Sequence, residues 1–175
     1  QDAIRCTYEY ADFIRQFTDS LTVPKEAYPD GITVLSPIET WSDDFSMAIA
    51  GIPSTVNDFS AGPFMQNYYH SQYDNQDVYQ EAVYQFHHEC YLKLIMAIDR
   101  LVLPPMNFSN TMNAVAESIH ENALSFADPE QNVLLRNLQT IIDSAENIYD
   151  KICQINAEYA TLSDSDARIA FRHKW

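Results

Sequence analysis

Apolar side chains recur at helical spacing near the start of the chain. Tyr10, Phe13 and Phe17 repeat every three or four residues between Thr7 and Leu21. This pattern predicts an amphipathic helix over residues 7–21, in which Thr7 is suited to cap the first turn. Because a residue before proline disfavours helical backbone angles, we expect the helix to end at Val23-Pro24.

A longer apolar pattern of the same period covers most of the second half of the sequence. It predicts three helices, which span residues 76–103, 107–126 and 129–162. Long helices, few glycines and short connections are typical of a helical bundle. Residues 163–175 are polar at first and then mixed, and their pattern predicts no element.

The segment between these helical regions has the pattern of an α/β sheet domain. It predicts a short strand at 32–35, a short helix capped by Ser42 or Asp43 and closed by Gly51, and a strand at 52–56. A helix, a glycine and an apolar strand in succession are typical of a doubly wound sheet, whose functional residues lie beyond the carboxyl ends of its strands. The sequence therefore predicts a mixed fold: residues 1–75 form the end of an α/β sheet domain, and residues 76–175 form a helical domain.

Charge and cysteine content exclude several classes of function. The chain has 25 acidic and 10 basic residues, a net charge of −15, so we expect it to bind neither nucleic acid nor an anionic membrane surface. Cys6, Cys90 and Cys153 are far apart, which predicts neither a zinc knuckle nor a disulfide framework. The longest apolar run, residues 92–102, is interrupted by charges and is too short for a membrane span. No signal peptide is visible, and the cellular location stays open.

His70 is the strongest candidate for chemistry. It lies in the polar segment after the last expected strand, next to Tyr69 and shortly before Asp74. An imidazole in such a place can bind zinc through one nitrogen while its other nitrogen is held by a carboxylate or carbonyl. The neighbouring phenol can stabilise charge that develops on a carbonyl oxygen. The alternative interpretation is an ordinary surface or capping histidine.

Two other groups of polar residues have simpler interpretations. Asp43 and Asp44 favour the start of a helix electrostatically, and a carboxylate that contacts substrate is the alternative. His87 and His88 point about 100° apart on a helix, whereas a metal-binding pair needs a spacing of three or four residues. We therefore do not predict a metal site at His87 and His88.

In order along the chain, four segments resemble one family. These are Cys6-Thr7, Ser42-Asp43-Asp44-Phe45, Gly51-Ile52-Pro53-Ser54 and Tyr69-His70-Ser71-Gln72-Tyr73-Asp74. They resemble the glutamate carboxypeptidase and transferrin receptor family, within the wider group of co-catalytic zinc aminopeptidases. The resemblance spans nearly the whole chain, although its helical half is supported by architecture more than by motif.

The resemblance implies a role for three residues. It implies that His70 is the last protein ligand of a two-zinc site, and that Tyr69 contacts the substrate or the tetrahedral intermediate. It also implies that Asp43 lies near a peptide substrate. The helices after Asn75 resemble the region through which family members form two-fold homodimers.

The departures from the family pattern decide how much activity we expect. The family's other zinc ligands and its paired glutamates, one of which is the general base, lie upstream of the matched region, and this chain has no adjacent glutamate pair. One imidazole cannot hold two zinc ions. We therefore expect a C-terminal fragment of a zinc exopeptidase, inactive by itself and without stably bound zinc, whose parent cleaves terminal peptide bonds with zinc-activated water.

Two alternatives to the peptidase stay open. They are a non-catalytic dimerising relative and an unrelated helical interaction module. Residues 52–69 contain no Lys or Arg, so specificity for glutamate is not carried over. The substrate and the end of the peptide from which it is cleaved are also open.

Overall fold

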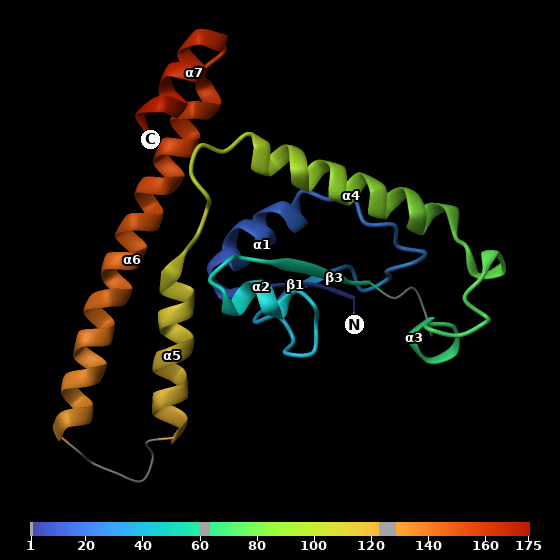
Figure 1. Cartoon of the computed structure of the whole chain (residues 1–175), viewed down its shortest axis with the longest axis horizontal. Helices are drawn as coiled ribbons and strands as arrows, with labels where there is room; N and C mark the ends of the chain where they lie inside the picture. Colours follow the sequence, from blue (N-terminus) through green and yellow to red (C-terminus); the bar gives the residue numbers. More distant parts are fainter. Residues whose placement is uncertain (1, 60–63, 123–128) are drawn as a thin grey trace. The chain divides into compact units, whose positions relative to one another are not determined.

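The fold is mixed and mostly helical, with one small sheet in the first half of the chain and helices throughout the second half (Figure 1). The computed structural model describes residues 2–59, 64–122 and 129–175. This confirms the predicted combination of a sheet-containing region and a C-terminal helical region. In chain order the elements are β1 (Ala3–Cys6), η1 (Tyr8–Tyr10), α1 (Ala11–Asp19), β2 (Thr33–Leu35), α2 (Phe45–Ile49), β3 (Thr55–Asp58), α3 (Phe64–Asn67), η2 (Gln76–Val78), α4 (Glu81–Asp99), α5 (Phe108–Asn122), α6 (Pro129–Thr161) and α7 (Ser165–Lys174).

The chain divides into two compact units. The first contains residues 1–7 and 13–99, and the second contains residues 8–12 and 100–175. Helix α4 belongs to the first unit, in which its Phe86 and Cys90 side chains are buried. The boundary expected near Asn75 lies before α4, whereas the compact units separate after it.

The sheet of the first unit has the order β2-β1-β3. Strand β1 pairs in parallel with β2, with Ile4 opposite Val34. It pairs in antiparallel with β3, with Ile4 opposite Asn57. The expectation of a doubly wound sheet is therefore wrong for β3, because β3 runs antiparallel to β1. Its carboxyl end lies at the edge of the sheet where β1 and β2 begin.

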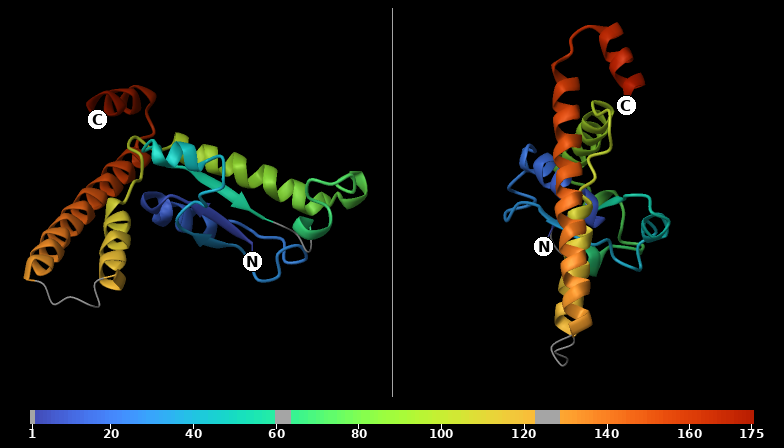
Figure 2. Two further views of the ribbon diagram at one scale, coloured as in Figure 1. Left: turned by 60° about the horizontal axis from the view of Figure 1, so that its bottom comes forward. Right: turned by 90° about the vertical axis from the view of Figure 1, so that its left-hand side faces the viewer.

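Strand β1 is the central strand, and the sequence pattern did not predict it. Its Ala3, Ile4 and Cys6 side chains point alternately to the two faces of the sheet and are all buried, so both faces are covered at this central strand. The helix expected over residues 7–21 is observed as η1 followed by α1, and the strand expected at 32–35 is observed as β2. Helix α1 lies along the sheet and contributes Ile14 and Phe17 to the core (Figure 2).

An aromatic cluster joins α4 to the rest of the first unit. Tyr28, whose side chain is 1% exposed, lies 5.8 Å from Phe59 and 5.5 Å from Phe86 between ring centroids. Its hydroxyl is 3.0 Å from Nε2 of His87. Burial raises the pKa of Tyr28 to about 12 and lowers the pKa of His87, so both groups are neutral at pH 7. His88, by contrast, directs Nδ1 to the carbonyl of Tyr84 on the helix surface, 2.9 Å away.

The second unit is built on the pairing of α5 with α6 (Figures 1 and 2). Helix α6 buries Leu138, Ile142 and Ala145, which share one face at helical spacing. The starts and ends predicted for α5 and α6 agree with the structure to within one residue, except that the predicted end of α5 at 126 lies outside the described residues. Residues 165–174, which the pattern left unassigned, form α7, and the Asp164 carboxylate caps it by accepting a hydrogen bond from the Ala167 amide at 2.8 Å.

In the part of the chain that the structure describes, no helix combines the length and the apolar character that crossing a membrane requires.

Candidate functional site

The Tyr69-His70 pair lies on a tight turn that follows α3. The amide of Ser71 donates a hydrogen bond to the carbonyl of Tyr68 (3.0 Å), and the Ser71 hydroxyl donates to the same carbonyl (2.6 Å). The amide of Tyr73 in turn donates to the Ser71 hydroxyl (3.1 Å). The backbone around His70 is thus held by hydrogen bonds of its own segment.

His70 has an unusual backbone conformation for a residue with a side chain. Its φ angle is +55°, and among the described residues no other non-glycine residue has a positive φ. This left-handed conformation costs about 1 kcal/mol for a residue with a Cβ atom. The imidazole is exposed, its centroid lies 4.1 Å from that of the Tyr69 ring, and it has no hydrogen-bond partner among the described residues. Its ring nitrogens are therefore accessible to a ligand.

Tyr69 also borders a cavity of about 520 Å³, which we call the acidic cavity. Residues from β1, from the segment before α2, from β3 and from the Tyr69 turn surround it. Its lining consists of Arg5, Glu39, Trp41, Ser42, Asp43, Asp44, Val56, Asn57, Asp58, Phe59, Phe64 and Tyr69.

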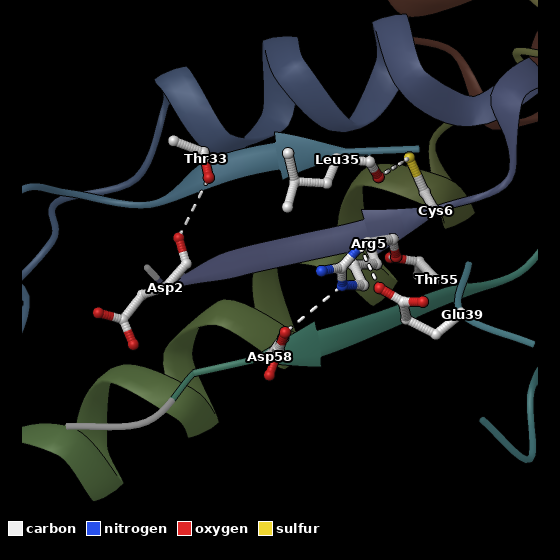
Figure 3. Close-up of polar contacts among 8 residues, drawn as sticks. All are labelled: Asp2, Arg5, Cys6, Thr33, Leu35, Glu39, Thr55 and Asp58. Atoms are coloured by element: carbon white, nitrogen blue, oxygen red, sulfur yellow. Dashed lines mark hydrogen bonds and ion pairs between the residues drawn. The ribbon is translucent and has the colours of Figure 1, made fainter. Parts of the chain in front are cut away.

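The single cation of this lining is already paired. Arg5 Nη1 lies 2.9 Å from Oε1 of Glu39, and Arg5 Nε lies 3.4 Å from Oδ2 of Asp58 (Figure 3). The two remaining carboxylates differ in their partners. Asp44 accepts a hydrogen bond from the Ser42 hydroxyl (3.0 Å), whereas the exposed carboxylate of Asp43 has no partner among the described residues. The cavity thus has four carboxylates and one guanidinium, with a net negative charge.

The structure brings together two of the three residues singled out in the sequence. Asp43 and Tyr69 line the same cavity, although 25 residues separate them. His70 does not line it but follows Tyr69 on the turn, and its ring touches the Tyr69 ring. The capping role considered for Asp43 is not observed, since Asp44 is the residue before α2 and its side chain makes no capping hydrogen bond.

Several cavity residues were missed by sequence reasoning. Arg5 carried a usable signal, because it is the one charged residue in the apolar run of β1. Glu39 and Trp41 carried none, since they lie in an irregular segment whose position depends on tertiary contacts. Asp58 ends β3, a strand that was expected to end at Val56.

His70 is the candidate metal ligand of this region. Within the described ranges, no three His, Cys, Asp or Glu side chains are grouped closely enough to hold a metal ion. The exposed imidazole of His70 is suited to be one ligand of a zinc ion.

A second cavity, of about 460 Å³, lies beside the amino-terminal end of α4. It is lined mainly by aromatic and aliphatic side chains, including Tyr79, Val83 and Tyr84, and His87 lies in its wall. The Nε2 atom of this histidine is already engaged by Tyr28.

Comparison with known proteins gives no family for this chain. No family model matches it, and no curated protein or solved structure matches it significantly.

Proposed function

We propose that this chain supplies His70 as one zinc ligand, and Tyr69 as a substrate-contacting residue, to a zinc-dependent exopeptidase. The observation that supports this most directly is the left-handed conformation of His70 on an exposed turn. Backbone strain of this kind is concentrated at functional sites, where it fixes the direction of a side chain. The turn's own hydrogen bonds hold the imidazole next to Tyr69, which lines the acidic cavity.

Each residue has a separate task in the proposed site. Zinc, when bound, supplies an activated water for attack on a terminal peptide bond. His70 contributes one nitrogen ligand, and the Tyr69 hydroxyl donates a hydrogen bond to the carbonyl oxygen of that bond. Asp43 accepts hydrogen bonds from the peptide within the same cavity. The general base and the other ligands belong to polypeptide outside these 175 residues.

The test is to replace His70 by alanine in the natural protein that carries this chain. We expect the bound zinc to fall from roughly two ions per chain to about one or fewer. Hydrolysis of terminal peptide bonds should fall by at least about a hundredfold, because even partners of zinc ligands contribute about 10–100-fold. Zinc is measured by elemental analysis after dialysis, and hydrolysis by release of terminal amino acids.

The matched control for this experiment is His88→Ala. His88 is also an exposed histidine of the first unit, but its contacts are with its own helix, at the carbonyl and the ring of Tyr84. It should keep both zinc and activity. A parent protein without zinc, or a His70→Ala variant with full zinc and activity, would contradict the peptidase proposal and favour the non-catalytic alternative.

We further propose that the chain forms a homodimer through its C-terminal helices. Leu134, Ile141 and Ile148 are each about half exposed on α6 and recur at intervals of seven residues. An apolar stripe of this period is typical of a helix that packs against another helix. This stripe borders the buried face of α6 but is itself about half exposed, so it is suited to contact with a second copy of the chain.

Sedimentation at micromolar concentration tests the dimer. We expect a dimer that buries on the order of 1,000 Å² or more, and we expect the double variant Ile141→Lys, Ile148→Lys to shift it toward monomer. The control Asn147→Lys adds a charge at an exposed position on another face of α6. A monomeric wild-type chain, or an equal effect of the control, would contradict this interface.

A further inference from the structure

We infer that the acidic cavity binds a positively charged amino or guanidinium group of a peptide. This inference rests on the proposed function for the identification of the ligand as a peptide substrate. The cavity's chemistry selects the charge of that ligand. It combines a concave space, unpaired negative charge and exposed aromatic faces in one place.

The charge distribution is the first argument. Arg5, the one basic residue of the lining, is engaged by Glu39 and Asp58 on either side (Figure 3). The lining therefore offers no unpaired cation to a ligand carboxylate. It does offer the Asp43 carboxylate, which has no partner among the described residues. An acidic side chain would be repelled there, whereas a cation would gain a charge-assisted hydrogen bond.

The aromatic side chains are the second argument. The Trp41 side chain is 78% exposed, and Tyr69 is 49% exposed, yet both line the cavity. No cation of the described residues lies over either ring, whereas Tyr159 of the second unit has two arginines within 5.2 Å of its ring centroid. Aromatic faces next to a carboxylate attract ammonium and guanidinium groups through cation–π interaction.

Size and geometry favour an organic cation over a metal ion. A volume of about 520 Å³ lies within the range of about 300–1,000 Å³ that is typical of small-ligand sites. No three carboxylates of the described residues converge closely enough to hold one metal ion. The carboxylates instead border a space that an amino-acid residue can enter.

The positive group can come from two parts of a peptide. It is either the free α-amino group of the terminal residue or the side chain of a lysine or arginine near the cleaved bond. Both present the same chemistry to Asp43 and Trp41. The first source would make the parent an aminopeptidase, and the second would make it selective for basic residues.

Nuclear magnetic resonance of the 175-residue chain separates these sources. The indole N–H signal of Trp41 reports on the cavity, and that of Trp175, which does not line it, is an internal reference. The ligands are three peptides: trialanine amide with a free amino terminus, acetyl-Ala-Lys-Ala amide and acetyl-Ala-Glu-Ala amide. We expect at least one of the first two to shift the Trp41 signal saturably, and we expect the glutamate peptide to leave it unchanged.

Asp43→Asn tests the role of the unpaired carboxylate. This variant has nearly the same shape and lies at an exposed position, so the fold should be retained. We expect the dissociation constant of the cationic peptide to rise about two- to fivefold, as for an exposed ion pair. Asp30→Asn removes a charge at an exposed position that does not line the cavity, and it should leave binding unchanged.

The outcomes separate this inference from the proposed function. Preference for the glutamate peptide, equal shifts of both tryptophan signals, or equal effects of the two variants would overturn the inference. These measurements need no zinc. Binding of cationic peptides here, together with a parent protein that lacks zinc, would therefore overturn the peptidase proposal and leave the cavity's ligand class intact.

Discussion

Replacement of Asn156 by alanine is expected to lower the free energy of unfolding of the second unit by about 2–4 kcal/mol. The Asn156 side chain is 9% exposed and makes three hydrogen bonds to one backbone segment. Its Oδ1 accepts from the amides of Val102 (3.0 Å) and Leu103 (3.1 Å), and its Nδ2 donates to the carbonyl of Leu103 (3.0 Å). Alanine would leave these three backbone groups without their partner in a site that is largely closed to water.

Asn147→Ala is the matched control for this prediction. Asn147 lies on the same helix, and its side chain donates one hydrogen bond to the carbonyl of Asp143 (2.8 Å), but it is exposed. Water can replace that bond, so we expect the free energy of unfolding to change by less than about 0.5 kcal/mol. Urea denaturation followed by circular dichroism measures both variants. Equal losses in the two would show that Asn156 does not hold the 102–103 segment.

Replacement of Asn107 by alanine is expected to have the second large effect. It should lower the free energy of unfolding of the second unit by about 2–4 kcal/mol. Asn107 immediately precedes α5 and is buried. Its Oδ1 accepts hydrogen bonds from the amide (3.1 Å) and the hydroxyl (2.7 Å) of Ser109, so it caps the helix. Its Nδ2 donates to Oδ2 of Asp12 (2.7 Å). The variant loses a cap that contributes about 1 kcal/mol and a charge-assisted bond that contributes about 1.5–3 kcal/mol.

Asn107→Asp separates these two contributions. An aspartate keeps the cap but places a second carboxylate against Asp12, so it should lose the charge-assisted bond and add repulsion at neutral pH. Asn113→Ala, at an exposed position of α5, is the control for helix propensity. Thermal unfolding measures all three variants. If Asn107→Asp were as stable as the wild type, the bond to Asp12 would not contribute to stability.

The long helices could be predicted from the sequence because their signal is local and repeated. Leu138, Ile142 and Ala145 illustrate this on α6, where one buried face recurs through many turns. Helix α7 has only ten residues and shows too few turns for the same pattern to stand out. Strand β1 was missed for a related reason: it has only four residues, and its three apolar side chains are all buried, so there is no alternation to recognise.

The candidate site could be predicted only in part. Tyr69, His70 and Asp43 came from short motifs, which are contiguous and can be recognised one at a time. The acidic cavity also needs Arg5, Glu39 and Asp58, which are far apart in sequence and meet through strand pairing and ion pairs. A pattern within one segment contains no information about which distant segments come into contact.

By itself, the sequence determined the helical second half, the negative charge and the position of the Tyr69-His70 segment after the last strand, because each depends on neighbouring residues or on simple counts. Only the tertiary structure decided that β3 runs antiparallel to β1, and that α4 belongs to the same compact unit as the sheet. It also decided that the one arginine of the acidic cavity is paired while Asp43 is not. These features depend on which distant segments bury each other's surfaces. Which segments do so is determined by the packing of the whole unit and not by the pattern within any one segment.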